Sequence, residues 1–315
     1  MKIAIYCHDA GAGELLIALY EHFINIFSFT HYTIQNSPYD KLLHTKSICY
    51  VTSTQESIYQ NLTTKRYDMI LFGTSWQDDT EKFFLQYAKI NSIPTIAFLD
   101  HWTFYDKRFK NTYPDYIATH DFYSTQIAKQ NNLPNIIPIK NYYLDKLLTQ
   151  YKKLDIKEKN QLLYCTEPTA EVAKKRFGNP DYWGFNEIDI YKELQKIAQQ
   201  YNLSLKLRLH PSDTPQKYLA IDKNLMISKQ TLIEDIAESK LIIGIDTIAL
   251  YYAYVFNKYA VSYIPSNSRK ATIPLPKTNI ISNINLLDIN TLQLGDESIL
   301  HYNNIEFDTF AKKIS

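Results

Sequence analysis

Short apolar runs alternate with amphipathic segments along the whole chain. Runs of about four to six apolar residues predict buried strands, and the segments between them have the spacing of helices. This alternation is typical of β-α units that build parallel sheets. In the first half the predicted strands cover residues 2–7, 31–35, 48–51, 69–72, 95–99, 116–118 and 136–139, and the clearest helix covers residues 80–90.

A second series of strands follows a charged helical segment at residues 141–159. Its members are predicted at residues 161–165, 203–209, 224–227, 241–245, 259–264 and 279–282. Two such series predict an α/β fold of two Rossmann-like domains with a cleft between them. We expect an N-terminal domain at residues 1–150, a C-terminal domain at residues 151–300, and a helix within residues 301–315 that packs back on the first domain.

Composition narrows the class of partner and the compartment. The chain has 315 residues, and its 34 Lys and Arg nearly cancel its 33 Asp and Glu, so no overall field attracts nucleic acid. Cys7, Cys49 and Cys165 lie in or beside predicted strands without the spacing of metal ligands, which predicts three buried, reduced thiols. Reduced thiols, and the lack of an apolar run long enough to cross a bilayer, favour a cytoplasmic protein.

The turn after the first strand is the first candidate site. Its sequence, HDAGAGE, contains Asp9, Gly11 and Gly13. Glycines in such a turn let the backbone bend tightly and let a ligand approach the helix N-terminus, whereas a simple connecting turn is the alternative. Leu16 occupies the third glycine position of the dinucleotide fingerprint, so NAD binding is not expected.

Asp100 follows the strand IPTIAF and stands beside His101 among aromatic residues. Burial raises the pKa of a carboxyl group, which would suit Asp100 as a general base. Capping of a helix that begins near Thr103 is an equally open alternative.

Two clusters in the second half end strands with groups that suit a phosphate. Glu167 follows the first strand of that half and could contact a ribose or sugar hydroxyl, or be a simple turn acid. His210, Pro211 and Ser212 end the strand KLRL, two residues after Arg208. The histidine can donate to a phosphate oxygen, proline fixes the turn, and Ser212 or the residue after it can cap the next helix.

Glu234, Asp246 and Thr247 complete the candidate set. Glu234 lies on a predicted helix and could reach a ribose, with a solvated helix acid as the alternative. Asp246 and Thr247 begin a helix whose N-terminal N–H groups can bind an anion. Asp246 is also an ordinary N-cap residue, and a carboxylate beside a phosphate is repulsive unless it is protonated or turned away.

The HP pair at residues 210–211 and the DT pair at residues 246–247 make the second half resemble nucleotide-sugar transferases of the two-domain GT-B fold. The resemblance is strongest to bacterial sialyltransferases and to related capsule or lipopolysaccharide transferases. It implies a donor with a CMP leaving group. Because CMP leaves with a single phosphate and the sequence has no DxD motif, we expect neither a metal ion nor another cofactor.

The same resemblance implies roles for individual residues. His210 and Thr247 would hold the donor phosphate, Glu234 would bind the ribose, and Asp100, or else Asp9, would be the base. The resulting hypothesis is an inverting glycosyltransferase. It would move an acidic sugar, such as a nonulosonate or octulosonate, to a surface glycan or lipid-linked glycan.

Two rival functions remain open. A UDP-sugar 2-epimerase or hydrolase has the same tandem fold, and a non-catalytic, two-lobed ligand-binding protein would bind its ligand without turnover.

Basic clusters add a prediction about location. Lys107, Arg108 and Lys110 form one cluster, and residues 174–176, Lys-Lys-Arg, form the other. Such clusters predict weak peripheral contact with the inner face of a membrane.

Overall fold

The computed structural model describes residues 1–75, 80–109, 112–266, 268–301 and 304–314. The chain divides into two compact units. Unit 1 contains Met1–Lys146 and Ile299–Ser315, and unit 2 contains Leu147–Ser298. The boundary between the units therefore falls within one helix, α7 (Tyr142–Lys152), rather than in an extended linker.

Unit 1 contains a sheet of seven parallel strands in the order β3-β2-β1-β4-β5-β6-β7. The strands are β1 (Lys2–Tyr6), β2 (Ser28–Ile34), β3 (Tyr50–Ser53), β4 (Met69–Gly73), β5 (Thr95–Phe98), β6 (Tyr116–Thr119) and β7 (Ile136–Pro138). All seven strands predicted for this half are confirmed, with ends that differ by a few residues. Since β1 is central and every neighbour is parallel, the carboxyl ends of the strands share one edge.

Helices cover both faces of the unit 1 sheet because alternate strand residues are apolar on both sides. Ile3 and Ile5 pack in one core with α1 and α13, and Ala4 and Tyr6 pack in a second core with α3 and α4. The helices are α1 (Ala10–Phe23), α2 (Pro38–Thr45), α3 (Gln55–Thr63), α4 (Glu81–Ile90), α5 (Tyr105–Arg108), α6 (Phe122–Gln130), α7 and α13 (Phe307–Ile314).

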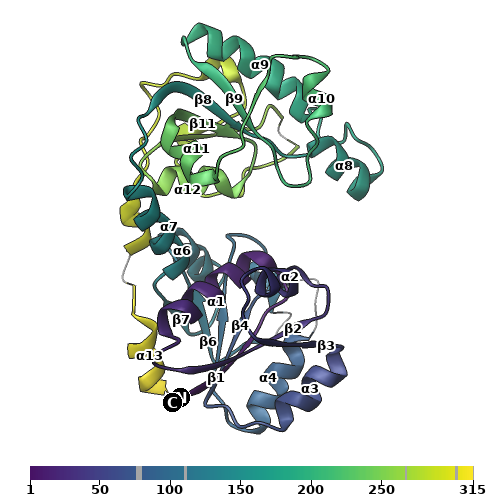
Figure 1. Ribbon diagram of the computed structural model, residues 1–315, viewed down its shortest axis with the longest axis vertical. Helices are drawn as coiled ribbons and strands as arrows, with labels where there is room; N and C mark the ends of the chain where they lie inside the picture. The colour runs from purple at the N-terminus through teal and green to yellow at the C-terminus, as the bar shows by residue number, and fades with distance from the viewer. Residues whose placement is uncertain (76–79, 110–111, 267, 302–303, 315) are drawn as a thin grey trace. The chain divides into compact units, whose positions relative to one another are not determined.

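The C-terminal segment belongs to unit 1 (Figure 1). Phe307 is fully buried in the first core, and its backbone N–H donates to the hydroxyl of Tyr142 over 3.0 Å. Ile305 also pairs with Ile139, directly after β7, as a parallel bridge. The segment thereby extends the edge of the sheet beyond β7.

Unit 2 contains a second parallel sheet of six strands in the order β10-β9-β8-β11-β12-β13. The strands are β8 (Lys159–Cys165), β9 (Ser204–Arg208), β10 (Met226–Ile227), β11 (Ser239–Gly244), β12 (Tyr259–Tyr263) and β13 (Ile280–Ile281). Each overlaps a predicted strand. The helices are α8 (Thr169–Phe177), α9 (Glu187–Gln200), α10 (Gln216–Leu219), α11 (Leu232–Glu238) and α12 (Ile248–Val255), and short 3-10 turns complete the unit. Helix α9 covers one face of this sheet, and α11 and α12 cover the other (Figure 1).

One of the three cysteine predictions is wrong. Cys7 and Cys165 are buried, and burial raises the pKa of both thiols, that of Cys165 to about 12. Cys49 is exposed, because β3 begins one residue later and lies at the edge of the sheet. An apolar run at an edge strand was therefore mistaken for a buried one.

Candidate functional site

Most of the predicted site residues lie at the carboxyl edges of the two sheets, where ligands of parallel α/β proteins bind. In unit 1, Asp9 follows β1 and Asp100 follows β5. In unit 2, Glu167 follows β8, His210 follows β9, and the pair at residues 246–247 follows β11. Strand order places β8 between β9 and β11, so Glu167 stands between the two predicted phosphate groups.

Asp100 is held by a guanidinium at the edge of unit 1. Its Oδ1 lies 2.7 Å from Nη1 of Arg108, and the same nitrogen donates to Oγ1 of Thr74 over 2.6 Å. Asp100 is not a helix cap, because α5 begins after Phe104. Arg108 is 10% exposed in its side chain and is committed to this contact, so it does not present its charge to a membrane. Lys110 and the side chain of Lys107 lie outside the described residues.

The two glycines of the first turn make room for protein side chains. A Cβ at Gly11 would lie 2.7 Å from Oδ2 of Asp100, and a Cβ at Gly13 would lie 2.4 Å from Cδ2 of Tyr39. Both glycines are inside α1, and neither has a positive φ, so a tight left-handed turn is not their role. Gly13 is buried against the ring of Tyr39, where a ligand has no room. Gly11 is exposed and lies beside Asp100.

His8 and Asp9 form a pair at the end of β1. Nδ1 of His8 lies 2.7 Å from Oδ1 of Asp9, and the two side chains are 24% and 34% exposed. A carboxylate can only accept, so Nδ1 carries a proton, and in the neutral ring Nε2 of His8 is an acceptor. Asp9 precedes α1 without bonding its N–H groups, so its carboxylate is committed to the histidine. This is the arrangement of a histidine oriented to accept a proton.

A second histidine at this edge escaped the sequence analysis. His120 follows β6 and is 7% exposed, and its Nδ1 has no hydrogen-bond partner among the described residues. Its Nε2 lies 3.5 Å from Oδ2 of Asp121, which also accepts the indole N–H of Trp102 over 3.0 Å. His120 lines a small, mostly apolar cavity together with Phe98 and Lys140. The sequence signal was present, since HD follows the strand YIAT, but it resembles an ordinary helix cap, a role that Asp121 also performs.

His210 is exposed on a turn that is fixed to the neighbouring strand. Its backbone N–H donates to Oγ1 of Thr166 over 3.1 Å, and that hydroxyl donates to Asp213 over 2.6 Å. Its Nδ1 lies 2.7 Å from Oγ of Ser212 and accepts the Ser212 backbone N–H over 3.2 Å. Nδ1 is thus an acceptor, so the neutral ring carries its proton on Nε2. Pro211, between them, is also exposed.

The helix cap predicted for this turn is wrong, and Arg208 has another partner. Arg208 does not join His210, because it is paired with the buried carboxylate of Asp235 at 2.7 Å and donates to the carbonyl of Gln230. Neither Ser212 nor Asp213 caps a helix, since α10 begins after Pro215 without a side-chain cap.

Glu167 and Asp246 are joined by an arginine that sequence reasoning missed. Oε1 of Glu167 accepts the backbone N–H of Asp246 over 2.5 Å, and Oε2 lies 2.7 Å from Nη2 of Arg269. The same nitrogen lies 3.8 Å from Oδ2 of Asp246. The guanidinium stacks over the ring of Trp183, with its carbon 5.2 Å from the ring centroid. One cation thus compensates both carboxylates at the centre of the edge.

Asp246 holds a loop rather than a helix. Its Oδ1 accepts the backbone N–H groups of Thr272 and Ile273 over 2.7 and 3.0 Å, and its Oδ2 accepts the hydroxyl of Thr272. The residue that caps α12 is Thr247, whose hydroxyl accepts the N–H of Ala249. The carboxylate of Asp246 is therefore turned into the loop after β12, which leaves the start of α12 to Thr247 and to backbone N–H groups.

Glu234 is a helix-capping residue. Its Oε2 accepts the backbone N–H and the hydroxyl of Thr231 over 2.8 and 2.7 Å, which closes a capping box at the start of α11. The backbone hydrogen bond from Thr231 lowers the pKa of the Glu234 carboxyl. A ribose would have to compete with this cap.

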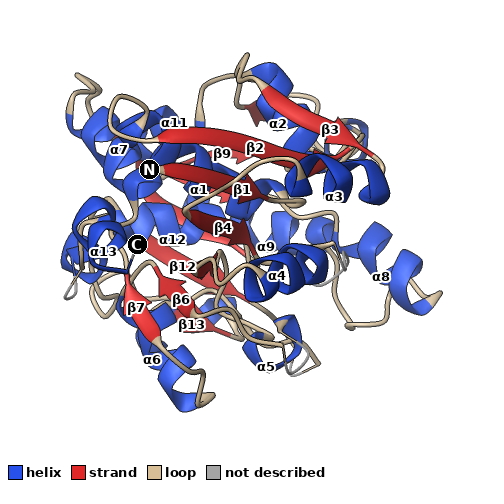
Figure 2. Ribbon diagram, turned by 90° about the horizontal axis from the view of Figure 1, so that it is seen from below, coloured by secondary structure: helices blue, strands red, loops and turns tan. Residues whose placement is uncertain are grey.

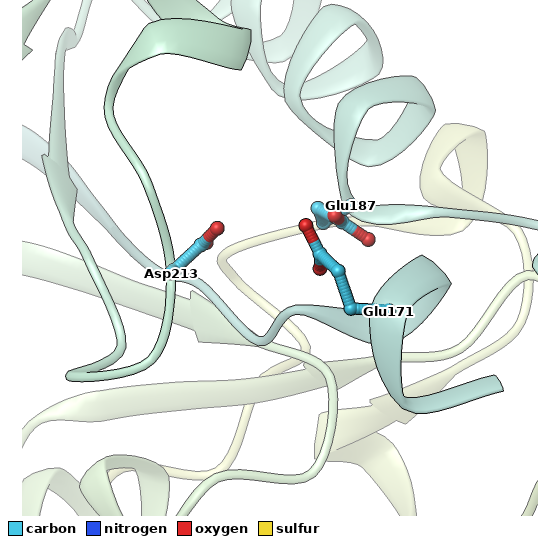
Figure 3. Close-up of side chains that lie close together, drawn as sticks. All are labelled: Glu171, Glu187 and Asp213. Carbon is cyan, nitrogen blue, oxygen red and sulfur yellow. The ribbon is translucent and has the colours of Figure 1, made fainter. Parts of the chain in front are cut away.

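Three carboxylates gather below the His210 turn. Glu171, Glu187 and Asp213 come from α8, α9 and the loop after β9, and their oxygens lie within 4.8 Å of one another (Figure 3). They are the one such group among the described residues. Lys217 pairs with all three and lies 2.6 Å from Asp213, so an internal cation already compensates the cluster.

Comparisons with known proteins bear on the fold. No protein-family model matches the chain, and no curated protein matches its sequence. Among solved structures, a candidate UDP-N-acetylglucosamine 2-epimerase from Listeria monocytogenes is 12% identical, with 84% of this chain and 79% of that chain covered and a TM-score of 0.57. Anabaena HepE in complex with UDP and glucose is 11% identical, with 99% and 97% covered and a TM-score of 0.55. MurG from Acinetobacter baumannii is 10% identical, with 83% and 78% covered and a TM-score of 0.52.

At these identities the likeness shows the fold alone. The predicted fold class is confirmed as two Rossmann-like domains with parallel sheets, in the GT-B-like tandem that these proteins share. The narrower resemblance to sialyltransferases stays a prediction.

Proposed function

We propose that the protein is a glycosyltransferase that takes a sugar from a nucleotide donor bound at the carboxyl edge of unit 2. One observation supports this most. The strand ends that carry Glu167 and Asp246 are linked through Arg269 beside the start of α12, and the backbone of His210 is hydrogen-bonded to Thr166, the residue before Glu167. A solved structure of the same fold, HepE, holds UDP and glucose.

The donor phosphate would lie against Arg269 and the first turn of α12. Helix N-terminal N–H groups attract anions, and a guanidinium offers several donors of which Glu167 uses one nitrogen. Nε2–H of His210 and the hydroxyl of Thr247 would add further donors. These groups would stabilise the charge that develops on the leaving phosphate, which is where such donors accelerate transfer most.

The two carboxylates at this edge do not oppose such a phosphate. Glu167 is bonded to Arg269 and to a backbone N–H, and Asp246 is bonded to the loop after β12. Their charge is compensated within the protein, which meets the requirement that a carboxylate near the phosphate be turned away.

The acceptor hydroxyl would be activated at the edge of unit 1. Its oxygen attacks the anomeric carbon, the bond from that carbon to the phosphate oxygen breaks, and the hydroxyl proton passes to the base. We favour Nε2 of His8, oriented by Asp9, because both side chains are partly exposed at the edge and Nε2 of the neutral ring is an acceptor. Asp100 as the base stays a prediction, and its ion pair with Arg108 makes it better suited to positioning that arginine.

The finer proposal concerns the donor. A CMP-linked acidic sugar is our first candidate, because the HP and DT pairs support it and because one phosphate needs fewer compensating groups than two. UDP- and TDP-linked sugars are the alternatives, since HepE was solved with UDP and a spinosyn rhamnosyltransferase, 7% identical and with a TM-score of 0.53, with thymidine diphosphate.

A nucleotide panel in a thermal unfolding assay tests the proposal. A nucleotide at about 100 times its Kd should add about 2.7 kcal/mol to stability. CMP should raise Tm most, and cytidine, which lacks the phosphate, should raise it little. Absence of any shift with CMP, UDP and TDP would contradict the proposal.

Epimerisation is the second candidate function, because the Listeria protein of the same fold carries that assignment. Product analysis separates the two functions. An epimerase or hydrolase consumes a nucleotide sugar without an acceptor, whereas the proposed transferase forms a new glycosidic bond only when an acceptor is present.

A further inference from the structure

An exposed basic and aromatic surface lies at the end of α8 in unit 2. Residues 174–182, KKRFGNPDY, form an unbroken run of exposed residues. Figures 1 and 2 both show α8 and the loop after it standing out from the unit 2 sheet. We call residues 174–182 the α8 tip.

Two aromatic rings of the α8 tip face solvent. Phe177 is 46% exposed and Tyr182 is 50% exposed, and their rings stack with centroids 3.8 Å apart. Isolated exposed apolar residues are common and need no explanation. Here two rings form one apolar plate, and the phenyl ring has no group that water can hydrogen-bond.

Three cations adjoin this plate. Lys174, Lys175 and Arg176 occupy the last turn of α8, and none of them forms an ion pair with another described residue. Asp181 is the single acidic residue in the tip, so the formal charge of the tip is three minus one, or +2. The cations are therefore available to an external anion.

The plate is held in one conformation. Gly178 ends α8 with a φ of +74°, which favours glycine, and its N–H donates to the carbonyl of Lys174 over 2.9 Å. The N–H of Tyr182 donates to the carbonyl of Asn179. Trp183 is buried next to the plate and stacks on Arg269. A preorganised surface loses little conformational entropy when it binds.

We propose that the α8 tip docks reversibly on an anionic lipid membrane. Aromatic rings settle at the headgroup level, and adjacent Lys and Arg are attracted by anionic headgroups. A soluble anionic polymer would use the three cations but would give the stacked rings no apolar phase to enter. No helix among the described residues is long and apolar enough to span a membrane. The contact is therefore peripheral.

Of the two basic clusters predicted from the sequence, only the one at residues 174–176 lies wholly within the described residues. Arg108 is committed to Asp100 and Thr74, whereas the cations of the α8 tip are exposed. This inference does not rest on the proposed function, because membrane binding is measured without donor or acceptor.

Vesicle co-sedimentation of the full chain tests the docking. Vesicles of phosphatidylcholine with phosphatidylglycerol should pellet the protein at low salt, and pure phosphatidylcholine should not. The triple variant Lys174→Gln, Lys175→Gln, Arg176→Gln should bind about 10²-fold more weakly. The matched control replaces three exposed lysines elsewhere in unit 2, Lys223, Lys229 and Lys277, by Gln and should bind like the parent.

The rings are tested separately with Phe177→Ala, Tyr182→Ala, which keeps the charge. This variant should lose the part of the binding that persists as salt is raised, because screening weakens the electrostatic part alone. Three results would overturn the proposal: no pelleting with anionic vesicles at low salt, equal loss in the control triple, or unchanged binding of the ring variant at every salt concentration. Retention on heparin without vesicle binding would assign the tip to a soluble polyanion instead.

Discussion

The carboxyl edges of the two units differ in the hydrogen-bonding groups that they offer to a ligand. Unit 1 offers an acceptor, and unit 2 offers donors. At the edge of unit 1, Nδ1 of His8 is bonded to Asp9, so that Nε2 of the neutral ring is an acceptor, and Arg108 at that edge is paired with Asp100. At the edge of unit 2, His210 takes its hydrogen bond from Ser212 so that its outer nitrogen donates. The carboxylates there are compensated by Arg269.

The contrast follows from local partners and not from residue type. A histidine after a strand occurs at both edges, but Asp9 makes one an acceptor and Ser212 makes the other a donor. An acceptor suits removal of a proton from a hydroxyl, and a set of donors suits a phosphate. The two edges therefore offer the two kinds of group that the proposed transfer reaction requires.

The sharpest test of the acceptor edge is His8→Ala. Loss of a general base lowers turnover by about 10² to 10⁴, so transfer should collapse while nucleotide binding to unit 2 persists. Steady-state kinetics with acceptor measure the first effect and calorimetry the second. His44→Ala, at an exposed position on α2, is the control.

Asp100→Asn completes that comparison. It keeps the size of the side chain, and we expect a loss of transfer below about tenfold, much less than removal of a base costs. Collapse of transfer in Asp100→Asn together with normal transfer in His8→Ala would restore Asp100 as the base.

Lys217→Met tests whether the carboxylate cluster of unit 2 is structural. Removal of the cation leaves Glu187 and Asp213, with side chains 2% and 0% exposed, without compensation. Breaking a buried pair in this way costs about 3–5 kcal/mol. Urea unfolding measures the loss. Lys192→Met, whose partner Asp189 is exposed, should change stability by less than about 0.5 kcal/mol.

The pH dependence of that loss has a definite sign. Burial acts to raise the pKa of Asp213, but hydrogen bonds from Lys217, Thr166 and Tyr218 outweigh it and lower the pKa. Burial acts to lower the pKa of Lys217, but Asp213 and Glu187 raise it. The cluster therefore stabilises the fold from about pH 4 to about pH 10. The difference between parent and variant should shrink in acid as Asp213 is protonated, and a difference that grows in acid would contradict this account.

Gly13→Ala asks whether the first glycine turn serves packing or a ligand. The added Cβ would lie 2.4 Å from the ring of Tyr39, and such overpacking costs about 1–3 kcal/mol. Thermal unfolding should show the loss, with nucleotide affinity unchanged. Lower affinity in a variant of parental stability would return Gly13 to a binding role.

Glu167→Gln has the smallest expected effect. The amide oxygen can keep the hydrogen bond from Asp246, while the charge opposite Arg269 disappears. Nucleotide affinity should rise by about fivefold, or about 1 kcal/mol, because Arg269 no longer shares its charge with a carboxylate and is free for the phosphate. A tenfold weaker nucleotide would show that Glu167 contacts the donor directly.

Much of the architecture could be predicted from the sequence. Periodicity located every strand of both sheets because the central strands are buried on both faces and the edge strands have a similar apolar composition. The same logic placed Asp9, Asp100, Glu167 and His210 at strand ends. This prediction failed at Cys49, because the apolar residues of an edge strand are less buried than those of a central strand.

The chemistry of the site was less accessible. Arg108 binds Asp100 from eight residues away, but Arg269 reaches Glu167 across 102 residues, and no local pattern marks that contact. Arg208 stands two residues before His210 in the sequence, but its partner in the structure is Asp235 on α11. Strand periodicity determines which residues reach the edge of a sheet. Tertiary contacts determine which of their atoms remain available to bind a ligand.

Calorimetric titration of CMP and UDP into the parent, Arg269→Ala and Lys270→Ala tests the donor edge most directly. Lys270 is the exposed neighbour of Arg269 and is the charge-matched control. The account predicts that Arg269→Ala weakens nucleotide binding by about 10² or more, since a charge-assisted contact to phosphate is worth about 1.5–3 kcal/mol and Glu167 would be left uncompensated. Lys270→Ala should bind like the parent. Equal affinity in the parent and Arg269→Ala would contradict the assignment of this edge to the donor phosphate.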